Sequence, residues 1–261
     1  MGHKRYGYLP KSKRWLIITE ELDKFASSGN GDIRKIANLT LQHVRTHFDK
    51  LKVEPSVLAT FEYLLQLSKA YKTDSPLEYL QINGILDESE LSLIKIGRGL
   101  QKYTENSVAS KELQAISVHA GIDALNKWFM VNNQYGLTLF NDKLDYNLIF
   151  GRISNAGNFS DLTRLYFSGF TEKFLKYFLE RTASTTFVNL NDRHRFKVEL
   201  EKHLNDISTH AFETTKITQS LIAAWHNKHL NDSFPDRQDI KEFLSFSFDK
   251  MKGELLREEV H

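Results

Sequence analysis

The stretch FSDLTRLYFSGFTEKFLKYFLERTAS, residues 159–184, decides the fold because it places seven aromatic side chains within twenty positions. The side chains at positions 162, 166, 170, 174 and 177 recur every four or three residues, so they share one face of a helix. Each large side chain buried on such a face contributes about 1.5 to 3 kcal/mol. The stretch is therefore predicted to be a central packing helix. The alternative is a ligand cradle or a partner groove.

The composition favours a helical globular protein without cysteine chemistry. The chain has 261 residues, of which 41% are hydrophobic, with four Pro, 13 Gly and no Cys. Few and dispersed Pro and Gly favour long helices over a many-turned β architecture. Without Cys there is no disulfide, thiolate metal site or cysteine nucleophile. No apolar run reaches the ~20 residues of a membrane span, and the N-terminus lacks the apolar core of a signal peptide. We therefore expect a cytoplasmic protein without a membrane partner.

Helical periodicity continues on both sides of the aromatic stretch, and the chain is treated as one domain, residues 1–261. Further helices are predicted over 15–27, 32–53, 57–73, 76–83, 87–103, 110–131 and 236–255. Short apolar runs make 135–154 less regular, so a small extended or hairpin region, or a bent helix, is expected there, with a soft boundary near 133–158. The predicted class is mainly α: an irregular multi-helix bundle of about eight helices.

One very long helix is predicted over about residues 192–230. Its apolar seam alternates spacings of four and three through Leu200, Leu204, Ile207, Ala211, Thr214, Thr218, Leu221 and Trp225. An unbroken helix would be roughly 57 Å long, so it should either kink near Thr214 or project from the domain. We predict that Leu221, Ile222 and Trp225 bind a partner, because Trp is a frequent interface anchor. Packing beneath the last helix is the alternative.

The net charge of +2 conceals a gradient, since residues 1–60 carry 11 Lys and Arg against 6 acids, whereas residues 201–261 carry 8 against 11. Basic side chains neutralise phosphates, and the aromatic residues interleaved with them near the N-terminus can stack on bases or anchor the segment. A solvated basic surface is the alternative for every candidate. The nucleic-acid candidates are Lys4, Arg5, Lys11, Lys13 and Arg14 in a basic N-terminal arm (residues 1–14), Lys95, Arg98 and Lys102 on one helix face, and Arg193 with Arg195 at the start of the long helix.

Catalytic motifs are missing from the sequence. It contains no Gly-rich phosphate loop, no G-x-S-x-G elbow and no H-E-x-x-H helix. The HEPN ribonuclease signature is not met either, because seven residues separate Arg195 from His203. His43 and His47 are four residues apart on one helix face and form a weak candidate metal pair, which needs a third ligand from elsewhere. The alternative is that both flank a core stripe. No cofactor is expected.

Two stretches carry a resemblance: MGHKRYGYLPKSKRW, residues 1–15, and the aromatic stretch. They resemble small all-α accessory subunits of bacterial anti-phage defence complexes of the Lamassu type, which are encoded beside nucleases or SMC-like ATPases. The resemblance covers about forty residues and contains no mechanistic motif, so no functional residue carries over. It implies an accessory subunit that docks on a larger SMC-like ATPase or nuclease in an assembly acting on DNA or RNA.

The predicted function is therefore that of a non-enzymatic helical subunit of a larger cytosolic assembly. Two other functions stay open. One is a free-standing nucleic-acid-binding protein that uses the basic N-terminal arm, and the other is a metal-dependent hydrolase built on His43 and His47.

Overall fold

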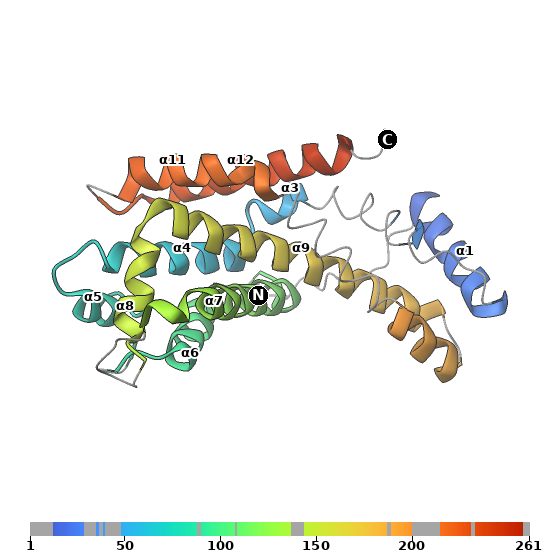
Figure 1. Ribbon diagram of the computed structural model, residues 1–261. Helices are drawn as coiled ribbons and strands as arrows, with labels where there is room; N and C mark the ends of the chain where they lie inside the picture. Colours follow the sequence, from blue (N-terminus) through green and yellow to red (C-terminus); the bar gives the residue numbers. More distant parts are fainter. Residues whose placement is uncertain are drawn as a thin grey trace.

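The computed structural model describes residues 13–28, 35–36, 39, 48–87, 90–107, 109–136, 144–186, 189–199, 215–230 and 233–257. Every regular element within these ranges is helical, which confirms the predicted mainly α class (Figure 1). The α-helices are α1 (Lys13–Ser28), α3 (Phe48–Leu51), α4 (Pro55–Ala70), α5 (Pro76–Ile82), α6 (Leu93–Thr104), α7 (Lys111–Asn132), α8 (Tyr146–Gly151), α9 (Ala156–Thr186), α11 (Gln219–Leu230) and α12 (Arg237–Arg257). Three 3-10 turns accompany them: η2 (Asn133–Gly136), η3 (Arg152–Ser154) and η4 (Lys216–Thr218). Residues 190–199 are also helical.

Helix α4 lies at the centre of the bundle. Twelve of its 16 residues are buried, and it contacts α5, α6, α7 and α12. Phe61 links it to the other layers, because its ring centroid lies 5.3 Å from that of Phe243 on α12 and 6.1 Å from that of Phe167 on α9. A helix enclosed on several sides needs apolar residues around most of its circumference, and the sequence of α4 provides them.

Helix α9 is the predicted aromatic helix, and its role in the core is confirmed. Its buried apolar side chains are Phe159, Leu162, Tyr166, Phe167, Phe170, Phe174, Leu175, Phe178 and Leu179. The helix begins at Ala156, before the predicted start, because the Asn155 side chain accepts hydrogen bonds from the backbone N–H of Gly157 at 2.9 Å and of Asn158 at 3.4 Å. With 31 residues it is about 46 Å long. It packs against α7 and α11 within the bundle and against α1 beyond it (Figure 1).

The structure decides one open alternative and corrects two expectations. Residues 146–154 form α8 and η3, in keeping with the bent-helix alternative, and no strand occurs in the described part of 135–154. Helix α6 begins at Leu93, because Ser92 caps it by accepting from the Lys95 backbone N–H at 3.3 Å, so Asp87 does not open this helix. The span 192–230 is not one uniform α-helix, because η4 precedes the start of α11 at Gln219. Residues 200–214 of that span, including the expected kink at Thr214, lie outside the described residues.

The described helices were also compared with the requirements of a bilayer. None of them is both long and apolar enough to cross a membrane.

Candidate functional site

A group of helices lies apart from the central bundle, at the far end of α9. We call α1, residues 174–186 of α9 and residues 190–199 the distal unit. Figure 1 shows α1 and the end of α9 separated from α4, α5, α6 and α7. Helix α1 contacts α9, and its Phe25 ring lies 5.6 Å from the Phe196 ring in an edge-to-face arrangement. The aromatic helix therefore extends from the bundle into the distal unit, whose buried apolar residues belong to the same core cluster.

Apolar and cationic contacts together hold the distal unit. Ile18, Leu22 and Phe25 form the buried face of α1, and Phe196 is the buried aromatic residue of the 190–199 helix. The Arg195 guanidinium lies 5.0 Å from the centre of the Phe25 ring and donates a 3.0 Å hydrogen bond to the Phe25 carbonyl oxygen. A cation over an aromatic face contributes about 0.5 to 1 kcal/mol at an exposed site.

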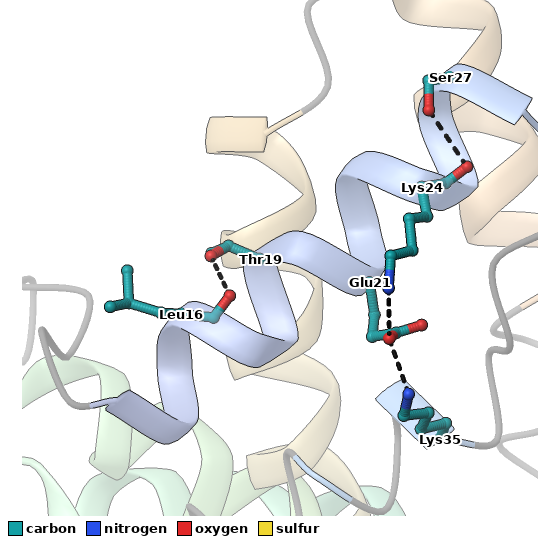
Figure 2. A network of polar contacts seen from close by, with 6 residues as sticks. All are labelled: Leu16, Thr19, Glu21, Lys24, Ser27 and Lys35. Carbon is teal, nitrogen blue, oxygen red and sulfur yellow. Dashed lines mark hydrogen bonds and ion pairs between the residues drawn. The ribbon is translucent and has the colours of Figure 1, made fainter.

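A carboxylate and two ammonium groups tie α1 to residues 35–36. Glu21, nearly buried, accepts from Lys35 Nζ at 2.7 Å and from Lys24 Nζ at 3.1 Å (Figure 2). The hydrogen bond from Lys35, followed by that from Lys24, lowers the pKa of the Glu21 carboxyl. Residues 35–36 are helical, and Ile36, which follows Lys35, is buried. The charge cluster therefore fixes a second chain segment against α1.

Both α1 and the 190–199 helix of the distal unit expose apolar side chains. On α1, Leu16 is 55% exposed and Ile17 is 41% exposed, while their neighbour Ile18 is fully buried. On the 190–199 helix, Leu190 is 75% exposed and Val198 is 38% exposed. Scattered apolar residues are normal on protein surfaces, and Ile82, Ile94, Met130 and Val131 are more exposed on the bundle than Leu16 and Ile17 are on α1. The exposed apolar residues of the distal unit differ from those of the bundle in position, because they lie on helices that project from the bundle. Other residues of the same helices are buried in packing contacts.

The predicted basic candidates are distributed rather than gathered at one site. Lys4, Arg5 and Lys11 lie outside the described residues, the side chain of Arg14 is not described, and Lys13 is exposed at the start of α1. On α6, the Lys102 ammonium pairs with Asp87 at 2.7 Å and that of Lys95 with Glu90 at 3.6 Å, whereas Arg98 is exposed. Arg193 is exposed beside Arg195, and Arg195 pairs with Asp192 at 3.4 Å. Neighbouring carboxylates thus already compensate three of these cations.

The predicted histidine metal pair cannot be located, because His43 and His47 lie outside the described residues. Among the described side chains, no three or more of His, Cys, Asp and Glu gather in a way that could hold a metal ion. His226 and His229 on α11 have separate surroundings: His226 is buried on Ser68, whereas the His229 ring stacks on Trp225 with centroids 4.7 Å apart.

The three predicted partner-binding residues on α11 contact the rest of the chain. Ile222 is fully buried, and Leu221 and Trp225 are partly buried against the core. The Trp225 ring centroid lies 4.6 Å from that of Phe243 on α12 and 6.5 Å from that of Phe61 on α4. These contacts favour the alternative considered for the sequence, in which Trp225 packs beneath the last helix.

A buried polar pair on α4 and α11 was not found from the sequence. Ser68 Oγ and His226 Nε2 lie 2.7 Å apart, and both side chains are fully buried. Nothing in the spacing of these residues signals the pair, because 158 positions separate them along the chain. Burial of the pair also prevents it from acting as a nucleophile and base on an external substrate.

A shallow polar recess lies where α8, η3 and α9 meet. It is lined by Asn147, Leu148, Gly151, Arg152, Ser154, Asn155 and Asn158. The polar atoms at this junction form hydrogen bonds within the chain. Asn155 caps α9, and the Asn158 amide donates to the Arg152 carbonyl oxygen at 2.9 Å. Arg152 Nε donates to Asn132 Oδ1 at 3.2 Å. The recess is therefore a structural junction.

Comparison with known proteins adds no relative. No family model, curated protein or solved structure matches this chain. The distal unit is thus the candidate functional site on structural grounds alone.

Proposed function

We propose that the protein is a non-enzymatic helical subunit that docks on a larger protein in the cytoplasm through its distal unit. The observation that supports the proposal is the extension of α9 beyond the bundle, where α1 packs on it and residues 190–199 pack on α1, with Leu16, Ile17, Leu190 and Val198 exposed. Apolar side chains on a projecting element, surrounded by charged residues, are the usual composition of an interface core and its rim.

The proposed partner is a larger subunit that acts on nucleic acid, such as an SMC-like ATPase or a nuclease. This part of the proposal comes from the resemblance of residues 1–15 and 159–184 to accessory subunits of anti-phage defence complexes. The resembling segments include the start of α1 and most of α9, which are elements of the distal unit or lead into it.

Co-expression with the products of the adjacent genes tests the proposal. We expect a complex on size-exclusion chromatography that is lost in a Leu16→Asp, Ile17→Asp variant, because two charges would have to be desolvated at the interface. The variant itself should remain folded, since both side chains are exposed in the free chain. The control is Ile82→Asp, Ile94→Asp, which changes two apolar residues on the bundle that are more exposed than Leu16 and Ile17.

Two outcomes would refute the docking proposal. One is a complex that survives the α1 variant but is lost in the bundle variant. The other is the failure of the chain to bind any protein encoded beside it.

A second candidate function is direct nucleic-acid binding by the basic N-terminal arm. One observation favours it: Lys13, the last lysine of that arm, is the first residue of α1 and is exposed on the distal unit. The arm would then extend the same surface that we propose for protein docking.

A further inference from the structure

The imidazole of His226 lies where α11 meets α4, α9 and η3. The side chain has no exposed surface, and its Nε2 atom is 2.7 Å from Ser68 Oγ on α4. Its ring centroid lies 4.8 Å from that of Phe159 on α9. Ser68 Oγ also donates a 3.0 Å hydrogen bond to the Ile153 carbonyl oxygen in η3. Two hydrogen bonds and one ring contact at Ser68 and His226 therefore connect α4, η3, α9 and α11 in the core.

The hydrogen bonds assign the protons in this contact. Ser68 has one hydroxyl proton, and it is used for the Ile153 carbonyl. His226 must then donate its Nε2 proton to Ser68 Oγ, which makes it the Nε2–H tautomer with Nδ1 as a bare acceptor. Among the described residues, Nδ1 makes no hydrogen bond of normal geometry. A second proton would therefore sit on Nδ1, beside the apolar ring of Phe159, where the cost of burying the charge exceeds the gain from the Asn227 side chain.

The charged groups on the surrounding elements do not favour a positive ring. The positive charge of Lys72, just beyond the end of α4, lowers the pKa of His226. The Lys69 ammonium donates a 3.0 Å hydrogen bond to the Leu230 carbonyl oxygen. On α9 the Asp161 carboxylate accepts from Gln219 at 2.7 Å. On α12 the Asp239 carboxylate lies 3.9 Å from His229, and in η3 Arg152 is itself a cation. Among the described residues, the Asn227 side chain favours the charged form through a hydrogen bond.

We propose that His226 is a proton-sensitive latch: the neutral ring holds α11 on α4 and α9, and protonation of the ring releases α11. Release would break the contact with Ser68 and would expose Ile222 and the Phe159 ring, both of which are fully buried in the closed state. The latch concerns α11 and is independent of the distal unit.

The linkage between proton binding and opening of α11 gives the direction and the pH range of the effect. Burial, and secondly Lys72, lower the pKa of His226 from 6.5 to about 4 in the closed state. The opened state binds the proton more readily, so the closed state is fully stable above pH 6.5 and loses stability as the pH falls from 6.5 towards 4. The equilibrium constant for opening α11 should rise roughly 20-fold between pH 7 and pH 5.

Hydrogen exchange at both pH values, corrected for the intrinsic exchange rates, tests the latch. Between pH 7 and pH 5, peptides from α11 of the unmodified chain should lose protection roughly 20-fold, whereas peptides from α7 should lose much less. His226→Gln should abolish the effect, because a glutamine amide can still donate to Ser68 Oγ but does not titrate. His229→Gln is the matched control on the same helix and should leave the effect unchanged. An equal loss of protection in His226→Gln and the unmodified chain, or in α7 and α11, would overturn the proposal.

A second measurement does not depend on how the variants fold. NMR of the chain with 15N-labelled histidine should assign the Nε2–H tautomer to His226 and show that this ring titrates well below its usual pKa of 6.5. A His226 ring that titrates near pH 6.5, or that carries its proton on Nδ1, would refute the latch.

Discussion

Ser117 Oγ on α7 and Tyr166 Oη on α9 lie 2.8 Å apart, and both side chains are fully buried. Ser117 in turn donates to Thr60 Oγ1 on α4 at 2.9 Å, so three hydroxyl groups from three helices form one chain. Since Ser117 uses its proton on Thr60, Tyr166 must be the donor to Ser117. Burial raises the pKa of Tyr166, which keeps the phenol protonated for this role. The contact defines the register between α7 and α9.

The losses from removing the two partners of this pair should not be additive. Ser117→Ala leaves the Tyr166 hydroxyl buried without its acceptor, and we expect a loss of about 1 to 3 kcal/mol in the free energy of unfolding. Tyr166→Phe should cost about 1 kcal/mol. In urea titrations the double variant should lose less than the sum of the single losses. Tyr177→Phe on the same helix, where the hydroxyl is only partly buried, is the control; strict additivity of Ser117→Ala and Tyr166→Phe would contradict this network.

Two glycines of α6 should respond in opposite ways to alanine. A Cβ atom at Gly99 would lie 2.1 Å from the Ile85 carbonyl oxygen and 2.8 Å from Tyr63 Oη, whereas one at Gly97 would meet nothing nearer than 3.9 Å. Gly99→Ala should therefore destabilise the chain by several kcal/mol, because the backbone at Ile85 has to move. Gly97→Ala should stabilise it by up to about 1 kcal/mol through helix propensity. Thermal melting of the two variants checks this, and equal effects would refute the close approach.

The sequence was sufficient to predict the helices in which apolar residues recur at helical spacing over many turns. The aromatic spacing predicted α9 and its buried face, because a helix with large apolar residues every three or four positions has to be covered. It misplaced helix starts by a few residues, since Asn155 and Ser92 compete with other polar residues nearby for the capping position. The short α8 was left ambiguous because a 6-residue helix shows less than two full turns of periodicity.

Contacts between residues that are far apart along the chain could not be predicted from the sequence. Gly99 on α6 is needed for the close approach of Ile85 and Tyr63, which no spacing in the sequence indicates. The basic face of α6 gave no sign that Asp87 and Glu90 pair with its lysines. The distal unit depends on Phe25 contacting Phe196, 171 positions later in the chain, and periodicity along either helix does not predict this contact.

The basic N-terminal arm should account for any affinity for duplex DNA. Because both lysines of α6 pair with carboxylates, most of the remaining candidates belong to the arm, whose first twelve residues precede α1 at Lys13. Deleting residues 1–12 should flatten the salt dependence of binding without lowering the melting temperature. The log–log slope should fall by roughly 0.9 for each phosphate that the shortened chain no longer neutralises. Lys95→Ala, Lys102→Ala is the control and should leave the slope unchanged. An unaltered slope after the deletion would show that the arm does not bind phosphate.

Trp225 should contribute to the stability of the isolated chain rather than to partner binding. Its ring packs on Phe243 and His229 with centroids 4.6 and 4.7 Å away, so truncation removes contacts between α11 and α12. Full burial of a Trp would give a loss of about 3 to 5 kcal/mol on truncation, and partial exposure should reduce the loss from Trp225→Ala to about 2 to 4 kcal/mol. Phe246→Ala is the control, since this ring is 45% exposed on α12 and should cost less than about 1 kcal/mol. Urea denaturation distinguishes the two roles: a Trp225→Ala chain as stable as the unmodified one, but unable to bind its partner, would restore the interface assignment of Leu221, Ile222 and Trp225.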